Sequence, residues 1–222
     1  MRIYLPEAIH PDKPFTLGRD FKKRLIRVMR LKPGDSIEVF TPGHRWICRL
    51  SQVLPDAVQL EPQQELPAAP TPRLKICLGQ ALMRGEKFDW VVQKATELGA
   101  TEIIPLLTQR TVVKALHIEN RWERWNEIAE QAAGQSENSY PPAIHFPERI
   151  SDFLKRNPES LRLILHERIG ALPLKQALLK DNVDSITFVV GPEGGWAPEE
   201  LQAFESAGFL RDRKSTRLNS SH

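Results

Sequence analysis

The chain changes its hydrophobic pattern at a proline-rich stretch, and this change constrains the fold more than any other feature of the sequence. Residues 61–72 carry four prolines and few bulky apolar side chains. Proline fixes φ and removes a backbone donor, so such a stretch favours an extended connection. We therefore predict a first domain of residues 1–61, a linker of residues 62–72 and a second domain of residues 73–210.

The first domain combines short strands with one charged helix. Residues 36–40, 46–50 and 57–60 are strand-like runs separated by turn residues. Residues 21–30 place apolar side chains at i, i+4, i+7 and i+8, which predicts a helix with one buried stripe: Phe21, Leu25, Val28 and Met29. Lysines and arginines fill the rest of that helix. The pattern is typical of a small β-barrel that carries a basic helix.

The second domain alternates strands with helices, which predicts an α/β sheet. The expected strands are residues 74–78, 102–106, 161–165 and 186–190. The expected helices are residues 88–98, 119–133 and 172–179, and a last helix that begins at Pro198. Proline in the first helical turn and acidic residues beside it suit the positive end of the helix dipole.

Charge is divided unevenly along the chain. Residues 1–72 hold 11 Lys and Arg against 8 Asp and Glu, whereas residues 73–210 hold 16 against 19. A basic first domain favours RNA as a partner, although a run of charges is also typical of a merely solvated helix face. No apolar run approaches the ~20 residues of a membrane span, and the N-terminus lacks a secretory signal, so we expect a cytoplasmic protein. Cys48 and Cys77 are expected as buried apolar residues, and no metal site is expected.

The most informative motif is a glycine-rich turn directly after the strand of residues 186–190. It consists of Gly191, Pro192, Glu193, Gly194 and Gly195. In open α/β sheets ligands lie outside the carboxyl ends of strands, where glycines let the backbone approach a flat ligand. The order of residues matches neither a phosphate P-loop nor a dinucleotide fingerprint.

A second segment follows the strand of residues 74–78. Arg84 and Lys87 bracket a glycine there and could hold a phosphate or an electron-rich base. In the helix that follows, Lys94 and Glu97 are spaced as an i,i+3 surface pair, which is at least as good an explanation as a functional one.

These motifs resemble the RsmE family, SPOUT-class enzymes that methylate N3 of a uridine in 16S ribosomal RNA. The resemblance covers nearly all of residues 1–208 and rests on five segments in the family's order: Arg27–Arg30 with Gly34-Asp35, Leu82–Lys87, Gln93–Gly99, Gln135-Ser136 and Gly191–Gly195. It implies a PUA-like RNA-binding barrel, then a trefoil-knotted SPOUT methyltransferase domain that binds S-adenosylmethionine, and a homodimer that acts on 16S RNA or the small ribosomal subunit.

The resemblance also implies roles for particular residues. Arg84 and Glu97 are the candidate catalytic residues, because loss of the uracil N3 proton calls for a base or for cations that stabilise the anion. The expected cofactor contacts are Leu165, His166, Gly191, Pro192, Glu193, Gly194 and Gly195; His166 could equally be a partly buried surface residue. The expected RNA contacts are Arg2, Lys22, Lys23, Arg27, Arg30, Lys87 and Lys94.

The sequence departs from the family pattern at three places. Arg24 stands where the family usually has histidine, and Asn138 where it usually has arginine. Residues 211–222 replace an expected strand and arginine-rich loop with a polar, basic segment. We interpret that segment as non-native, with a genuine RNA-binding tail as the rival interpretation. On the first interpretation the chain as given binds cofactor weakly and dimerises poorly, and a family-like C-terminal segment restores both.

Two other functions remain open from the sequence. One is a PUA-like RNA chaperone or ribosome assembly factor with an inactive second domain. The other is a SPOUT enzyme that methylates ribose in transfer RNA. Binding of S-adenosylmethionine separates the enzymes from the first alternative, and the position of the modified atom separates the two enzymes.

Overall fold

The computed structural model describes residues 2–67, 70–111, 118–156, 159–166 and 183–213. The chain forms two compact units. Unit 1 contains residues 1–71 and 127–141, and unit 2 contains residues 72–126 and 142–222. The expected helix at residues 172–179 and the last nine residues, 214–222, lie outside the described residues.

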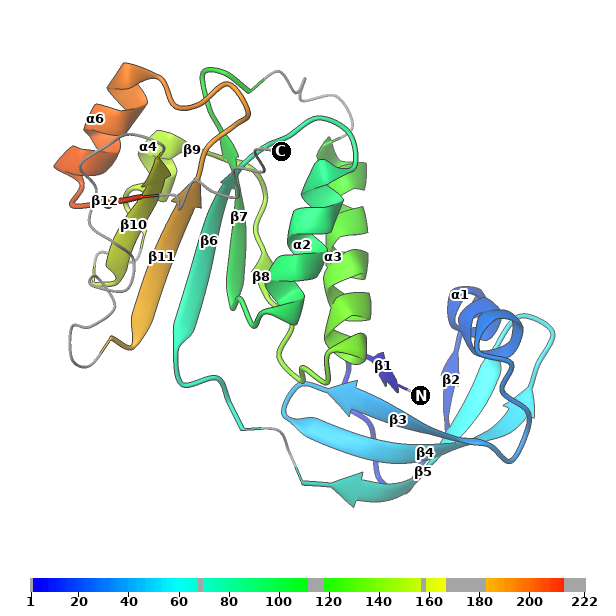
Figure 1. The fold of residues 1–222 in the computed structure, drawn as a ribbon. Helices are drawn as coiled ribbons and strands as arrows, with labels where there is room; N and C mark the ends of the chain where they lie inside the picture. The colour runs from blue at the N-terminus through cyan, green and yellow to red at the C-terminus, as the bar shows by residue number, and fades with distance from the viewer. Residues whose placement is uncertain (1, 68–69, 112–117, 157–158, 167–182, 214–222) are drawn as a thin grey trace, which may run out of the picture. The chain divides into compact units, whose positions relative to one another are not determined.

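Unit 1 is built on a five-stranded sheet that curls (Figure 1), and its apolar core includes buried residues of β1, β3, β4 and β5. Its strands are β1 (Arg2–Tyr4), β2 (Phe15–Leu17), β3 (Ser36–Thr41), β4 (His44–Val53) and β5 (Val58–Leu66), in the order β1-β3-β4-β5-β2. In β4, Trp46, Cys48 and Leu50 are buried while the residues between them are not, because successive side chains of a strand point to opposite faces. The curled sheet agrees with the expected PUA-like barrel, and β1 and β2 were not predicted.

The predicted basic helix is present but is not a regular α-helix. It begins as α1 (Arg19–Lys22) and continues as the π-helix η1 (Lys23–Val28). A π-turn holds more residues than an α-turn, so positions further along the segment rotate away from the stripe that α-helical spacing predicts. Leu25 is fully buried, as predicted, but Val28 is 71% exposed, so its placement in the buried stripe was wrong.

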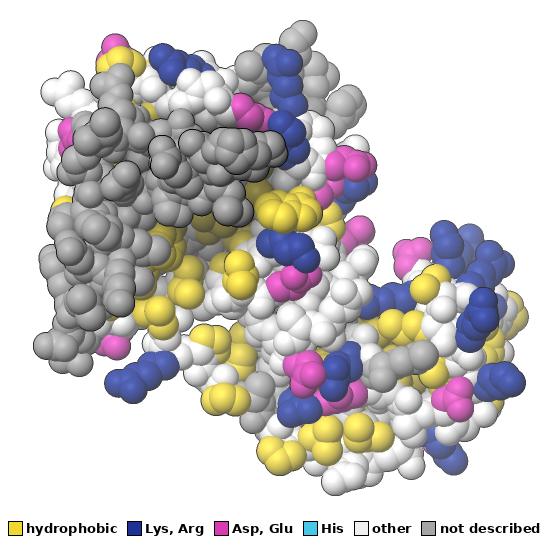
Figure 2. All heavy atoms as spheres, viewed as in Figure 1, with side chains coloured by type: hydrophobic (Ala, Val, Ile, Leu, Met, Phe, Trp, Pro, Cys, Tyr) yellow, Lys and Arg dark blue, Asp and Glu magenta, His cyan; other side chains and the backbone are white. Residues whose placement is uncertain are grey.

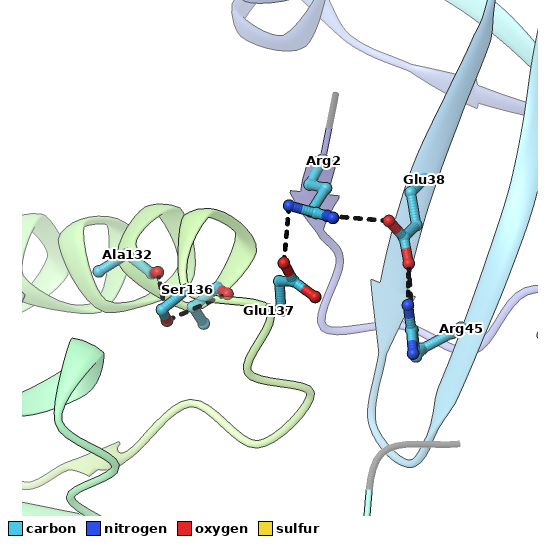
Figure 3. A network of polar contacts seen from close by, with 7 residues as sticks. Arg2, Glu38, Arg45, Ala132, Ser136 and Glu137 are labelled. Atoms are coloured by element: carbon cyan, nitrogen blue, oxygen red, sulfur yellow. Dashed lines mark hydrogen bonds and ion pairs between the residues drawn. The ribbon is translucent and has the colours of Figure 1, made fainter. Parts of the chain in front are cut away.

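A charge network ties the end of α3 (Ile118–Gln135) to the sheet of unit 1 (Figure 3). Arg2 Nε donates to Glu38 at 2.9 Å, and Arg2 Nη1 lies 2.9 Å from Glu137, just after the helix. Arg45 pairs with the same Glu38 carboxylate. Burial raises the pKa of Glu38, but hydrogen bonds from Arg45 and Arg2 outweigh it, so the pKa lies below its ordinary value.

The end of α3 joins unit 1 because small residues let it approach β1. Ala132 and Ala133 are buried, and a Cβ added to Gly134 would lie 3.0 Å from the backbone nitrogen of Tyr4. The sequence placed this helix wholly in the second domain, whereas residues 127–135 belong to unit 1. Alanines at helical spacing do not reveal which partner the helix will meet.

Unit 2 contains a seven-stranded sheet in which every pairing is parallel. The path runs β12-β10-β11-β6-β7-β8, with β9 also paired to β7. The strands are β6 (Lys75–Ala81), β7 (Glu102–Leu107), β8 (Ala143–Ile144), β9 (Glu148–Arg149), β10 (Leu161–His166), β11 (Ser185–Val190) and β12 (Leu210–Arg213). Continuous apolar runs such as residues 103–106 of β7 are fully buried, as parallel sheets covered on both faces require.

Helices complete unit 2. The helix α2 (Lys87–Glu97) lies beside α3 (Figure 1), where Phe88 stacks on Trp125 with ring centroids 4.4 Å apart. The helices α4 (Ile150–Phe153) and α6 (Pro198–Ser206) contribute Phe153 and Phe204 to a second core over β7, β10 and β11. The predicted α/β fold class is confirmed.

The structure differs from the predicted boundaries at two places. The strand β5 extends to Leu66, so residues 62–66 are paired with β4 rather than forming a linker. The strand β12 pairs with β10 and includes residues 211–213, the first three residues of the segment interpreted as non-native. Among the described residues, no helix is long and apolar enough to cross a membrane.

The two cysteines lie in different units, so their reactivity can follow the unfolding of each unit separately. Cys48 lies in the core of unit 1 and Cys77 in that of unit 2, and burial raises the pKa of each thiol to about 12. Because the thiolate is the reactive form, alkylation at pH 8 should be slower than for a free cysteine by about a thousandfold. Mass spectrometry of iodoacetamide adducts in increasing urea should show each site reacting when its own unit opens. Rapid labelling of either thiol in the folded chain would contradict this placement.

Candidate cofactor pocket at the strand ends

A hollow of about 720 Å³ lies at the carboxyl ends of neighbouring strands in unit 2. The lining residues come from the ends of β6, β10 and β11, the first turns of α2 and the glycine-rich turn: Gln80, Met83, Lys87, Trp90, Val91, Leu165, Val190, Gly191, Pro192, Glu193, Gly194, Gly195 and Trp196. From β6 the chain proceeds to β7 on one side, and β11 lies on the other. The hollow is therefore at the point where strand order reverses, where α/β sheets bind ligands.

The turn after β11 adopts a conformation that its glycines allow. Gly195 has a backbone φ of +71°, a value that residues with a side chain rarely adopt. Its N–H donates to the Pro192 carbonyl at 2.9 Å. Gly191 packs against the indole of Trp196, and a Cβ added there would lie 2.9 Å from two ring atoms. Trp196 in turn meets Phe204 of α6 with centroids 5.0 Å apart. The turn is thus fixed to the core behind it.

The segment between β6 and α2 contacts the same turn. Lys87 Nζ donates to Glu193 Oε1 at 2.9 Å, and both residues line the hollow. The hydrogen bond from Lys87 lowers the pKa of Glu193, and the charge of Arg84 lowers it further. The sequence predicted Arg84 as a catalytic residue, Lys87 as an RNA contact and Glu193 as a cofactor contact, and in the structure both cations act on Glu193. The ion pair is exposed, so its net stabilisation is small.

Two predicted residues lie away from the hollow. Glu97 ends α2, whereas the hollow is lined by residues of its first two turns, the nearest being Val91; the six-residue step from Val91 to Glu97 spans about 9 Å along the helix. Lys94 Nζ donates to Glu97 Oε2 at 2.7 Å, and this bond lowers the pKa of Glu97. The pair therefore has the geometry of the surface pair that was the alternative explanation. Leu165 lines the hollow, and the side chain of His166 lies outside the described residues.

The predicted RNA contacts of unit 1 lie mostly on the α1–η1 segment. Figure 2 shows lysine and arginine side chains gathered over this segment. Lys23, Arg27 and Arg30 are exposed, and Lys22 donates to the Pro55 carbonyl at 2.7 Å. Burial lowers the pKa of Arg24. Arg2 is engaged by two carboxylates, so it is less available to a phosphate than the helix residues are.

Sequence analysis missed two kinds of site residue. Apolar lining residues such as Trp90, Val91 and Trp196 are indistinguishable from core residues in a sequence. Arg110, three residues after β7, donates to the Gly194 carbonyl at 2.6 Å. A charged residue just beyond a buried parallel strand is a recognisable signal, because all such strands end at one edge of the sheet.

Comparison with known proteins identifies the family. The family model for an RNA methyltransferase domain matches residues 70–212, and the model for an RNA methyltransferase PUA domain matches residues 25–63. The chain belongs to the RNA methyltransferase family. The resemblance on which the sequence analysis rested is confirmed.

Curated relatives carry the name ribosomal RNA small subunit methyltransferase E. The protein from Synechocystis is 35% identical over 193 residues, which cover 83% of this chain and 61% of the relative. The protein from Bacillus subtilis is 28% identical over 211 residues, which cover 88% of this chain and 80% of the relative. The chain thus spans less than two thirds of the length of the Synechocystis protein.

Solved structures resemble nearly the whole chain. A methyltransferase from Legionella pneumophila in complex with S-adenosylmethionine is 26% identical with a TM-score of 0.90, covering 97% of this chain and 89% of that one. A ribosomal RNA small subunit methyltransferase E from Neisseria gonorrhoeae, bound to S-adenosylmethionine, is 29% identical with a TM-score of 0.87 and the same coverage. Both neighbours bind the same cofactor.

The packing of the glycine turn generates a paired prediction. Gly191→Ala forces a Cβ against the Trp196 ring and should lower the free energy of unfolding by about 1–3 kcal/mol. Gly194→Ala is the matched control, because its Cβ would meet only ordinary contacts, the nearest 3.6 Å from Arg110 Cδ. Urea unfolding followed by tryptophan fluorescence measures both. Equal stability of the two variants would show that the packing against Trp196 does not constrain the turn.

Proposed function

We propose that this protein transfers the methyl group of S-adenosylmethionine to N3 of a uridine in 16S ribosomal RNA. The observation that supports this most directly is the hollow beside the glycine turn, at the strand ends of a chain in the RNA methyltransferase family. Its volume lies within the range of small-molecule pockets. Relatives named for small-subunit ribosomal RNA methylation support the choice of RNA.

The residues present suit the proposed cofactor. Leu165, Val190 and Trp196 offer apolar walls for an adenosine, and the turn of residues 191–195 offers backbone groups at close range. The bound cofactor supplies an electrophilic methyl group, so the protein's main task is to align the uracil nitrogen with it. Lys87 lines the hollow and the charge of Arg84 acts on Glu193 there, so both cations are proposed to stabilise a deprotonated uracil.

Glu97 has a weaker place in this mechanism than Arg84. Its separation from the hollow and its bond to Lys94 favour a structural role on the surface of α2. We therefore assign anion stabilisation to the Arg84–Lys87 segment, and no general base to a particular carboxylate.

Recognition of the RNA is proposed to rest on unit 1. Phosphate contacts from Lys22, Lys23, Arg27 and Arg30 would position the RNA without reading its sequence. The family match to a PUA domain over residues 25–63 supports this assignment. We further propose that the protein acts as a homodimer on the small ribosomal subunit in the cytoplasm, as the resemblance implies.

The activity is tested with RNA that lacks the modification. The chain, and a form in which a family-like C-terminal segment follows Leu210, are incubated with S-adenosylmethionine and unmodified 16S RNA or small subunits. Mass spectrometry of the digested RNA should show one methyl group on a uracil base at N3. A methyl group on ribose, or on transfer RNA instead, would favour the ribose methyltransferase alternative. The absence of cofactor binding in both forms would favour the RNA chaperone.

The basic residues of the α1–η1 segment and Arg30 predict how RNA affinity depends on salt concentration. Replacing Arg27 and Arg30 together with glutamine should weaken RNA binding and reduce the slope of log affinity against log salt by about 1.4 for single-stranded RNA, because two phosphate contacts are lost. The control changes Lys13 and Lys75, exposed lysines outside the segment, and removes the same charge. Filter binding at several salt concentrations measures both. Full affinity of the Arg27 and Arg30 variant at low salt would exclude this surface.

A further inference from the structure

The proposed cofactor turn is held by a loop to which no role has been assigned. This loop follows β7 and contains Thr108, Gln109, Arg110 and Thr111. The hydroxyls of Thr108 and Thr111 lie 2.7 Å apart, and the backbone N–H of Thr111 donates to the Thr108 carbonyl at 3.1 Å. The hydroxyl of Thr111 also accepts from the Thr108 N–H at 3.1 Å. The loop is therefore a compact unit with its own hydrogen bonds.

Arg110 carries the first contact from this loop to the turn. Its Nη1 donates to the Gly194 carbonyl at 2.6 Å, and its Cδ would lie 3.6 Å from a Cβ at Gly194. Among the ion pairs of the described residues, none involves Arg110. Arg110 thus makes its polar contact with the turn itself, and a charged donor makes such a bond stronger than a neutral one.

Glu200 provides the second contact. Its carboxylate is buried, with the residue only 6% exposed, and it accepts two backbone N–H groups. Gln109 donates to Oε1 at 2.7 Å, and Ala197 donates to Oε2 at 2.9 Å. One carboxylate therefore joins the loop after β7 to the residue that precedes α6.

The two contacts connect the loop after β7 to Gly194 within the turn and to Ala197 just after it. Arg110 fixes the Gly194 carbonyl, while Glu200 fixes the neighbour of Arg110 to a residue two positions after Gly195. Without Glu200, the Gln109 N–H loses its acceptor and the loop can move away. Without Arg110, the turn loses its link to the loop.

We propose that Arg110 and Glu200 are positioning residues that hold the turn of residues 191–195 in the geometry that binds the methyl donor. Arg110 acts through the Gly194 carbonyl, and Glu200 acts through the loop that carries Arg110. The inference rests on the proposed function, because it assigns the cofactor to this turn.

The test measures binding of S-adenosylmethionine by calorimetry, in whichever of the two forms described above binds it more tightly. Arg110→Gln and Glu200→Gln should each raise the Kd about tenfold, the effect of losing one hydrogen bond to a charged group. Arg110→Lys keeps a charged donor and should recover part of the loss. Because both residues act on one turn, the double variant should lose less than the product of the single losses.

Matched controls separate positioning from charge. Glu199→Gln removes the same charge from the same helical turn as Glu200→Gln, but Glu199 is exposed. Arg73→Gln removes an exposed arginine elsewhere in unit 2. Both controls should keep the parent Kd within about twofold, since exposed charges contribute little. Melting without cofactor and the KM for RNA are also measured, and Arg110→Gln should leave both near the parent values.

The outcomes are distinct. If neither parent form binds S-adenosylmethionine, the proposed function fails and this inference fails with it. If the parent binds but Arg110→Gln binds equally well, or if Glu199→Gln weakens binding as much as Glu200→Gln, the positioning roles are wrong while the function stands. If Glu200→Gln does not fold, the Kd of the Arg110→Gln variant tests the proposal by itself, because Arg110 is exposed.

Discussion

The close packing of Gly191 against the indole of Trp196 is the constraint on which the site depends. It occurs directly after β11, where the backbone must leave a largely buried strand and still keep its polar groups satisfied. Trp196 packs against Phe204, and Phe204 packs against Phe153 and Phe209. The aromatic core therefore holds the turn in place. A turn anchored in this way can present its backbone to a ligand at little further entropic cost.

The polar contacts around the turn differ in strength because they differ in burial. The Lys87–Glu193 pair is exposed, with side chains 66% and 52% accessible, so water and salt screen it. The Glu200 carboxylate is buried and accepts two backbone donors, and removing an acceptor there leaves those donors without a partner. The geometry of the turn therefore depends more on Glu200 and on aromatic packing than on the Lys87–Glu193 ion pair, although the sequence pointed to Lys87 and Glu193 and not to Glu200.

The sequence predicted most of the fold of unit 2 and the part of the site that lies on strand ends. Apolar runs located β6, β7, β10 and β11, and the order of glycines located the turn. What could not be predicted depends on tertiary contacts: the π-turn that exposes Val28, the extension of β5 to Leu66, and the packing of Gly134 on Tyr4. Glu97 illustrates the same limit, because spacing along α2 alone does not show which end of the helix meets the hollow.

The charges around the hollow suit a reaction in which a positively charged methyl donor and a negatively charged uracil give products without these charges. Of its described lining residues, Glu193 is the one carboxylate, and Lys87 neutralises it; most of the other walls are apolar or backbone. A sulfonium and a deprotonated uracil are oppositely charged, and their product from methyl transfer carries neither charge. Because Glu193 is paired with Lys87, the described lining offers the sulfonium no free carboxylate as a competing counter-ion. A hollow lined with free carboxylates would instead hold the sulfonium in place. The pairing of Glu193 with Lys87 thus keeps the proposed cofactor site nearly neutral, so the proposed stabilisation of the anion falls mainly to Arg84, whose charge also acts on Glu193.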